Sequence, residues 1–289
     1  MLKTVELTKK LHKKDGAAML LGGFDGLHVG HCKLLSRAKE SGLPVGIMSI
    51  VGGKEEKNLF TFREREEIFK REGVDFVFEL PFAEIKDYPP EEFLGLLLKE
   101  FQPKLFICGE DFRFGAKAKG TPQTLKQATH VYVDVQSLVE IDGAKISSTY
   151  IKNLLKNGEV EQANSFLSEP FFLIGEVFSD RQVGRTIGFP TANVAYPMEK
   201  YPLKLGVYET RVEIDGITYK GITNYGARPT FDNQTVLTET HLDGFEGDLY
   251  GREMKIRFIR FLRDVQKFNG VNALKEQLTK DIRRIREDD

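Results

Sequence analysis

Residues 17–31 read Ala17-Ala18-Met19-Leu20-Leu21-Gly22-Gly23-Phe24-Asp25-Gly26-Leu27-His28-Val29-Gly30-His31. The first five residues are an apolar run, which indicates a buried strand. Glycines then mark a loop, and the spacing of Leu34, Leu35 and Ala38 predicts a helix after it. A strand, a glycine loop and a helix bring backbone N–H groups and the positive end of a helix to the strand's carboxyl edge, where a nucleotide phosphate can bind. The stretch therefore predicts the first βα unit of a nucleotide-binding α/β domain.

Strand and helix patterns continue to alternate as far as residue 139. The expected elements are strands at 45–50, 76–80, 105–108 and 131–135 and helices at 63–71, 91–100, 150–155 and 160–167. The alternation favours a Rossmann-like parallel sheet with helices on both faces. Glu169-Pro170 marks a break, because the residue before proline is pushed out of the helical region. We therefore expect a first domain at 1–168 and a second at 169–289.

Beyond the break the pattern changes to short strands. They are expected at 172–178, 206–214, 217–223, 237–241 and 253–261. Asp215-Gly216 signals a hairpin turn between two of them. A final helix at 271–285 carries its apolar side chains on one side, namely Leu274, Leu278, Ile282 and Ile285. The overall fold class is thus α/β, with a C-terminal antiparallel six-stranded β-barrel across which a terminal helix packs.

A phosphate and metal site is indicated in residues 181–193, Arg181-Gln182-Val183-Gly184-Arg185-Thr186-Ile187-Gly188-Phe189-Pro190-Thr191-Ala192-Asn193. In an extended segment the Thr191 hydroxyl and the Asn193 amide oxygen share one face, where both can reach one Mg²⁺. The glycines allow backbone N–H groups to approach an anion. The expected phosphate contacts are Gly184, Arg185, Gly188, Thr191 and Asn193. The alternative is a tight turn leading into a strand, with Asn193 as a turn residue.

A second cluster follows at 238–242, Thr238-Glu239-Thr240-His241-Leu242. With it, the second half resembles the riboflavin kinase family from Gly175 onward, through Gly188-Phe189-Pro190-Thr191-Ala192-Asn193, Gly206-Val207-Tyr208, Arg228-Pro229-Thr230-Phe231, Glu239 and Arg263. The resemblance implies that Thr191 and Asn193 hold Mg·ATP, that Glu239 takes the proton from the 5′-hydroxyl of riboflavin, and that Arg263 contacts the flavin. Phosphoryl transfer needs positioning, metal charge and one base, so a carboxylate suits this role. The alternative for Glu239 is an exposed strand carboxylate, and His241 is expected to be a structural imidazole.

The first half carries a second resemblance. His28-Val29-Gly30-His31 resembles the His-x-Gly-His signature of nucleotidylyltransferases, which implies that His28 and His31 contact ATP phosphates. Residues 109–115 and 145–152 resemble the matching elements of the FMN adenylyltransferase domain of bacterial FAD synthetases. The implied phosphate contacts are Gly23, Phe24, Asp25, Gly26, Ser147, Ser148, Thr149 and Lys152, and the implied flavin contacts are Asp111 and Arg113. Two alternatives remain: the histidines as metal ligands, although no third ligand lies nearby, and Ser147-Ser148-Thr149 as a helix cap.

Three features depart from the adenylyltransferase pattern. Gly23 stands where the family usually has an asparagine. Residues 48–57 contain no Pro-His-Pro element. Lys152 replaces an arginine, so it keeps the positive charge but loses the bidentate fork.

Composition excludes several other classes of function. The chain has 42 basic and 43 acidic residues, which argues against general nucleic-acid binding. Cys32 and Cys108 are too few for a disulfide framework, and no apolar run approaches the length of a membrane span. We expect a cytoplasmic enzyme, a monomer or weak homo-oligomer, with no nucleic-acid or membrane partner.

The whole chain resembles the family of bifunctional riboflavin kinase/FMN adenylyltransferases. That resemblance implies phosphorylation of riboflavin to FMN in the barrel domain and adenylylation of FMN to FAD in the α/β domain, both with ATP and Mg²⁺. Two alternatives stay open at this point. The first half can be a degenerate module that binds nucleotide or flavin for regulation, or the chain can be a flavin-responsive RNA- or protein-binding factor with an enzyme fold.

Overall fold

A computed structural model describes residues 3–7, 16–52, 57–179, 188–229 and 234–287. The chain divides into two compact units, Met1–Tyr150 and Ile151–Asp289, which we call the first and second unit. The division falls inside helix α6 (Ser148–Asn157), so α7 (Val160–Ser165) belongs to the second unit. The expected domain boundary after residue 168 stays a prediction.

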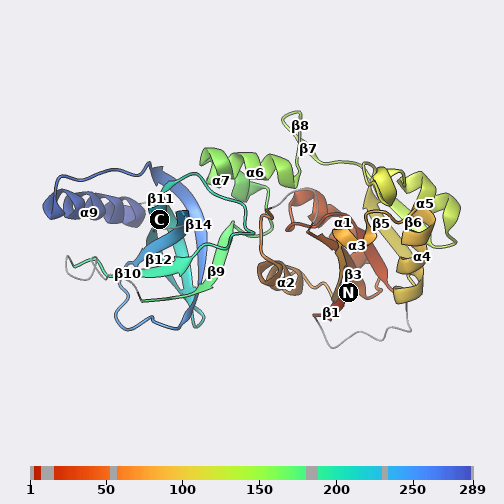
Figure 1. Cartoon of the computed structure of the whole chain (residues 1–289), viewed down its shortest axis with the longest axis horizontal. Coiled ribbons are helices and arrows are strands. Elements are labelled where there is room, and N and C mark those ends of the chain that lie inside the picture. The colour runs from red at the N-terminus through yellow and green to blue at the C-terminus, as the bar shows by residue number, and fades with distance from the viewer. Residues whose placement is uncertain (1–2, 8–15, 53–56, 180–187, 230–233, 288–289) are drawn as a thin grey trace. The chain divides into compact units, whose positions relative to one another are not determined.

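The first unit is built on a doubly wound sheet (Figure 1). Its five parallel strands lie in the order β4-β3-β2-β5-β6, with bounds Phe76–Pro81, Val45–Val51, Ala18–Leu21, Leu105–Gly109 and Tyr132–Gln136. Strand β1 (Lys3–Glu6), which the sequence pattern did not predict, pairs antiparallel with β4 at one edge. The strand order reverses between β2 and β5, and open α/β sheets bind ligands beyond the carboxyl ends of strands at such a switch point.

Helices cover both faces of this sheet, as the alternation predicted. They are α1 (Val29–Glu40), α2 (Phe62–Arg71), α3 (Phe82–Ile85), α4 (Pro90–Phe101) and α5 (Pro122–Ala128), with a 3₁₀ turn at Ala116–Ala118 and a small hairpin of β7 (Glu140–Ile141) and β8 (Ala144–Lys145). Met19 and Leu21 of β2 pack with Phe93 and Leu97 of α4 in one buried cluster. Leu20 points to the opposite face by strand alternation and is fully buried there.

The second unit contains a six-stranded antiparallel barrel in the order β10-β13-β12-β11-β14-β9. The bounds are Thr191–Ala195, Gln234–Leu242, Ile217–Pro229, Gly206–Ile214, Glu253–Arg263 and Phe172–Glu176. The barrel closes where the Phe178 N–H donates to the Asn193 carbonyl at 3.0 Å. The predicted hairpin turn is confirmed, because Ile214 pairs with Ile217 and the two turn residues have positive φ angles of 49° and 79°.

The terminal helix α9 (Val271–Glu287) packs on the outside of the barrel. Ile285 and Ile282, two of the four residues of the predicted apolar face, pack in a cluster with Val207, Ile222 and Leu262 of the barrel. The Arg263 guanidinium also donates to the Asp281 carboxylate of this helix at 2.8 and 3.0 Å. The outer face of β11 and β12 is therefore partly covered.

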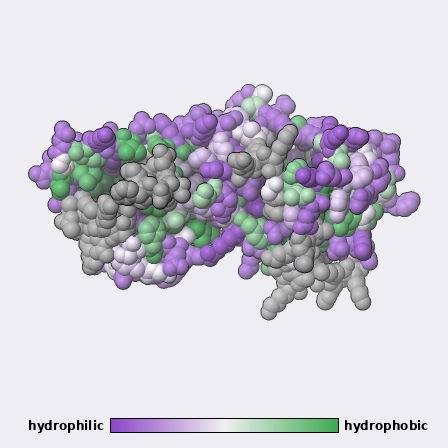
Figure 2. Space-filling model, in the orientation of Figure 1, coloured by the Kyte–Doolittle hydropathy of each residue, from purple (hydrophilic) through white to green (hydrophobic). Residues whose placement is uncertain are grey.

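Hydrophilic residues dominate the described surface that Figure 2 shows, and hydrophobic residues gather on it only in small patches. Within the described ranges, no helix combines the length and the apolar character that crossing a membrane requires.

Candidate active sites

The glycine loop after β2 is held in an unusual conformation. Phe24 has a positive φ of 40°, which a non-glycine residue adopts only when its surroundings enforce it. Its side chain is fully buried, and this packing holds the backbone in that conformation. Both carboxylate oxygens of Asp25 accept the Leu59 N–H at 2.9 Å, so the loop is tied to the segment before α2. A side chain at Gly26 would meet the Phe60 ring at 2.7 Å. The loop is thus fixed from two sides at the carboxyl edge of the sheet.

His28 and His31 lie together at the start of α1. Their rings stack with centroids 3.7 Å apart, and the Phe24 ring lies 4.4 Å from that of His31. His28 is the N-cap, and its Nδ1 accepts the His31 backbone N–H at 3.3 Å. Gly30 leaves little room beside them, because a Cβ there would lie 3.0 Å from the His28 ring and the ring would have to shift by a few tenths of an ångström.

Hydrogen bonds decide which ring nitrogens carry protons. The His31 Nδ1 lies 2.8 Å from the Gly26 carbonyl, and a carbonyl only accepts, so this nitrogen is the donor. The neutral His31 therefore keeps a lone pair on Nε2, whereas the neutral His28 carries its proton on Nε2. The pair therefore has one further donor, the His28 Nε2–H, and one further acceptor, the His31 Nε2.

Burial keeps both imidazoles neutral. It lowers the pKa of His28 to about 2, with the charges of His31 and Lys145 acting in the same direction. It lowers the pKa of His31 to about 4, although the Gly26 carbonyl and Asp111 oppose the shift. Among the described residues, no group of three or more His, Cys, Asp or Glu side chains suited to a metal occurs.

Two other predicted elements reach the same edge of the first unit. Asp111 follows β5, the neighbour of β2, and forms an exposed ion pair with Lys145 of β8. Arg113 donates to the Phe112 carbonyl at 2.8 Å. The Ser147 hydroxyl accepts the Tyr150 N–H at 3.3 Å, so the helix-cap interpretation of this serine is confirmed.

Gly23 and Lys152, two of the departures from the family pattern, lie in different surroundings. Gly23 is exposed, and a Cβ built on it meets nothing within 4 Å. Lys152 lies in the second unit and is only 4 % exposed, with its Nζ 5.6 Å from the centroid of the Tyr201 ring. Its buried side chain is not that of a solvated helix residue.

A second constellation lies on the barrel. Asn193 of β10 is directly opposite Glu239 of β13, and Thr191 is opposite His241. Directly opposed residues of an antiparallel pair point to the same face, so these four side chains form one patch. The Thr191 hydroxyl donates to the Glu239 carboxylate at 3.3 Å. Thr238 and Thr240, which alternate with Glu239, are fully buried in the barrel instead.

One atom of this patch is left without a partner. Asn193 is 7 % exposed, and its Oδ1 is buried without a hydrogen bond to any described residue. Buried acceptors are normally satisfied, so this oxygen is arranged for a donor or a cation. An amide oxygen, a hydroxyl and a carboxylate are the neutral and anionic oxygen ligands that suit Mg²⁺.

His241 ties the patch to the segment before β10. Its Nδ1 donates to the Pro190 carbonyl at 2.9 Å, and its ring meets the edge of Phe189 at 5.5 Å between centroids. It is a half-exposed structural imidazole in the unit, as the sequence predicted.

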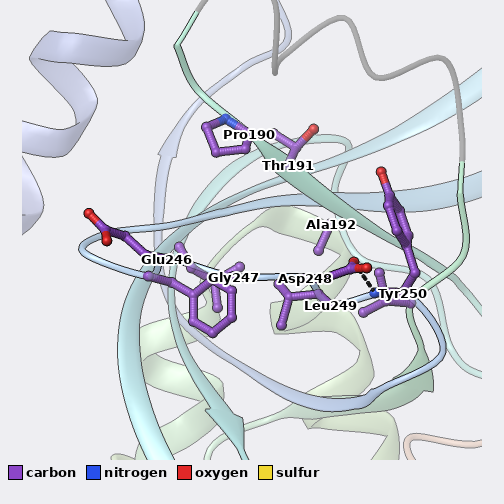
Figure 3. A pocket seen from close by; sticks show the side chains of 11 residues that line it. Pro190, Thr191, Ala192, Glu246, Gly247, Asp248, Leu249 and Tyr250 are labelled. Carbon is purple, nitrogen blue, oxygen red and sulfur yellow. Dashed lines mark hydrogen bonds between the residues drawn. The ribbon is translucent and has the colours of Figure 1, made fainter.

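A pocket of about 660 Å³ adjoins Thr191 (Figure 3). Thr191 and Pro190 lie on one side, and the loop 245–250 forms the other, with the Asp248 carboxylate accepting the Tyr250 N–H at 3.0 Å. The sequence prediction missed this loop and also Asn224, which lies opposite Glu239 on β12. Only the strand register, which no single-sequence signal supplies, would have placed Asn224 in the patch.

Four other predicted residues divide into three cases. Gly184 and Arg185 lie outside the described residues. Gly188 has a φ of 83°, a conformation that glycine favours. Arg263 is held by its ion pair with Asp281, and its contact with the flavin stays a prediction.

The fold defines the class of the protein, a doubly wound α/β domain followed by a six-stranded antiparallel barrel. The FAD synthetase family model matches residues 10–150, and the riboflavin kinase family model matches residues 167–288. The bifunctional riboflavin kinase/FMN adenylyltransferase of Bacillus subtilis (strain 168) is 34 % identical over 97 % of this chain and 96 % of its own. The enzyme of the same name from Escherichia coli (strain K12) is 34 % identical over 95 % of this chain and 93 % of its own. The chain belongs to the family of bifunctional riboflavin kinase/FMN adenylyltransferases.

A solved structure has the same fold over nearly the whole chain. The crystal structure of a macrolide-efflux protein from Streptococcus pneumoniae is 30 % identical, covers 96 % of each chain and superposes with a TM-score of 0.86. With both family domains present, the alternative of a kinase with a degenerate first module is not favoured.

Proposed function

We propose that the second unit transfers the γ-phosphoryl group of ATP to the 5′-hydroxyl of riboflavin, with Glu239 as the general base. The observation that carries this proposal is that Glu239 lies directly opposite Asn193, whose buried Oδ1 makes no hydrogen bond to a described residue. A carboxylate beside Thr191 and Asn193 can accept the hydroxyl proton while the nucleotide is held on the same face. The nucleoside part of ATP occupies the pocket between Thr191 and the loop 245–250.

Thr191 and Asn193 would hold Mg²⁺ in this site. The metal ion supplies positive charge to the phosphate oxygens when it is bound. The chain's own residues do the positioning: Thr191 is oriented by its hydrogen bond to Glu239, and the His241–Pro190 hydrogen bond fixes the approach to β10.

The first unit, in the same proposal, transfers the adenylyl group of ATP to FMN. The FMN phosphate attacks the α-phosphorus, the bond to the β-phosphate oxygen breaks, and pyrophosphate leaves. His28 donates its Nε2–H as a hydrogen bond to a phosphate oxygen and so stabilises the negative charge that develops on the leaving pyrophosphate, while the stacked His31 ring holds His28 in place. Asp111 and Lys145 lie where FMN would approach at the switch point.

We place both reactions in the cytoplasm, because Cys32 and Cys108 are both free thiols and ATP is a co-substrate. The test is direct. Purified protein is incubated with riboflavin, ATP and Mg²⁺, and riboflavin, FMN and FAD are separated by chromatography. Formation of FMN and then FAD is expected. FMN without FAD would contradict the adenylyltransferase assignment, and neither product would contradict both.

A further inference from the structure

Arg65 of α2 is a buried cation in the first unit. Arg65 is 2 % exposed, and its Nη1 donates to the Ser49 hydroxyl at 2.7 Å. Ser49 is itself fully buried in β3. Its Nε is buried and makes no hydrogen bond to a described residue. Charged side chains are rarely placed so deeply without a function or a partner.

No described carboxylate forms an ion pair with this guanidinium. Asp25, Glu79 and Glu66 are the acidic groups whose charges reach it, and they do not offset burial, which lowers the pKa of Arg65. An under-compensated buried charge exerts a stronger field on its neighbours than an exposed one, because little water screens it. Among those neighbours, Asp25 belongs to the glycine loop.

Several contacts join α2 to that loop. Asp25 accepts the Leu59 N–H with both oxygens, and the Phe60 ring closes against Gly26. Thr61 then caps α2 through a reciprocal pair of hydrogen bonds with Glu64, one residue before Arg65. The segment that Asp25 grips therefore leads directly into the helical turn that carries the buried cation.

We propose that Arg65 is a positioning residue for adenylyl transfer, whose buried positive charge holds the Asp25 carboxylate in place against Leu59 and so keeps the glycine loop in its binding conformation. This inference rests on the proposed function of the first unit. The loop includes Phe24, whose positive φ needs enforcement and whose ring lies against His31. Loss of the Arg65 charge would release Asp25, then Phe24, and then the catalytic imidazole.

The experiment compares Arg65→Met with Arg65→Lys and with Asp25→Asn. We expect Arg65→Met to lower kcat/KM for ATP in FAD synthesis from supplied FMN by about 30-fold, and Arg65→Lys to recover most of it because the charge is kept. The double variant Arg65→Met/Asp25→Asn is expected to be no less active in FAD synthesis than the less active of the two single variants, since both substitutions act through one contact. Arg71→Met, at the exposed end of the same helix, is the matched control, and kinase activity should stay within twofold throughout.

A second readout does not depend on activity. Hydrogen exchange at the Leu59 amide should be about tenfold faster in Arg65→Met than in the wild type, because the Asp25 acceptor is no longer held. If the wild type makes no FAD, the proposed function fails, and the exchange rate still decides whether Arg65 holds the loop. If Arg65→Met does not fold, Ser49→Ala replaces it and must show the same direction in both readouts. Unchanged exchange, or losses that multiply in the double variant, would overturn the proposal.

Discussion

Asn193 and Glu239 face each other across β10 and β13, and the buried Asn193 Oδ1 makes no hydrogen bond to a described residue although the Glu239 carboxylate lies on the same face. An isolated protein rarely leaves such an acceptor unsatisfied, because an unmade buried hydrogen bond costs about 1–3 kcal/mol. A ligand that donates a hydrogen bond or a cation to this oxygen would remove that cost.

Glu239→Gln should abolish FMN formation while leaving conversion of supplied FMN to FAD intact. A general base contributes about 10²- to 10⁴-fold, and an amide cannot accept the hydroxyl proton. The rate of FMN appearance, measured by chromatography, checks this, with the exposed Glu199→Gln as the control. Kinase activity within a few-fold of the wild type would remove Glu239 from the role of base, and parallel loss of both activities would indicate misfolding.

Asn193→Ala and Thr191→Ala should each raise the Mg²⁺ concentration at half-maximal kinase rate by about tenfold, the usual scale for weakening a metal site. Stability offers an independent measurement. Mg·ATP should raise the melting temperature of the wild type more than that of either variant, since ligand binding to the folded state stabilises it. An equal shift in all three proteins would show that these oxygens do not hold the metal ion.

Lowering the pH should reduce the stability of the first unit, because His28 and His31 are neutral when it is folded. Their pKa values in the folded protein, about 2 for His28 and about 4 for His31, lie below the ordinary value of 6.5. As pH falls, the two histidines therefore bind protons first in the unfolded chain, which lowers the free energy of unfolding. The stability that depends on their neutral form is fully present above pH 6.5 and is lost progressively below it. For His31 the loss between pH 6.5 and pH 4 is on the order of 3 kcal/mol.

Urea unfolding of the first unit, followed at pH 7 and at pH 4.5, measures this dependence. His31→Ala should flatten it, and the same variant should lower FAD synthesis by about 10²-fold at pH 7, where one preorganised contact to the leaving group is lost. His130→Ala, another histidine of the first unit, is the control. A pH dependence that His31→Ala leaves unchanged would contradict the assignment of the shifts to these residues.

The sequence predicted elements better than contacts. Strands β2 and β13 and the Asp215-Gly216 turn were expected because apolar runs and turn residues are local signals, and the structure confirms them. Strand β10, which carries Thr191 and Asn193, was not among the expected strands. The sharing of a face by Thr191 and Asn193 also followed from strand alternation. In contrast, the opposition of Asn193 and Glu239 depends on the register between two strands that are far apart in the sequence, and the burial of Arg65 depends on α2 packing against β3 and the glycine loop. Neither feature produces a periodic pattern in the sequence, so single-sequence reasoning missed both.

Gly23→Asn tests whether the departure at this position limits adenylyl transfer. The site has room, because Gly23 is exposed, a Cβ there meets nothing within 4 Å, and its φ is not in the left-handed region. We expect the variant to fold with an unchanged melting temperature and to raise kcat/KM for ATP in FAD synthesis by about 3- to 10-fold, since one added hydrogen bond to an anionic ligand is worth about 1–2 kcal/mol at best. Gly23→Ala, which adds no polar group, is the matched control and should behave like the wild type. If Gly23→Asn and Gly23→Ala have the same activity, an asparagine here makes no contact with the nucleotide, and the loop's hold on phosphate comes from its backbone and from His28 and His31.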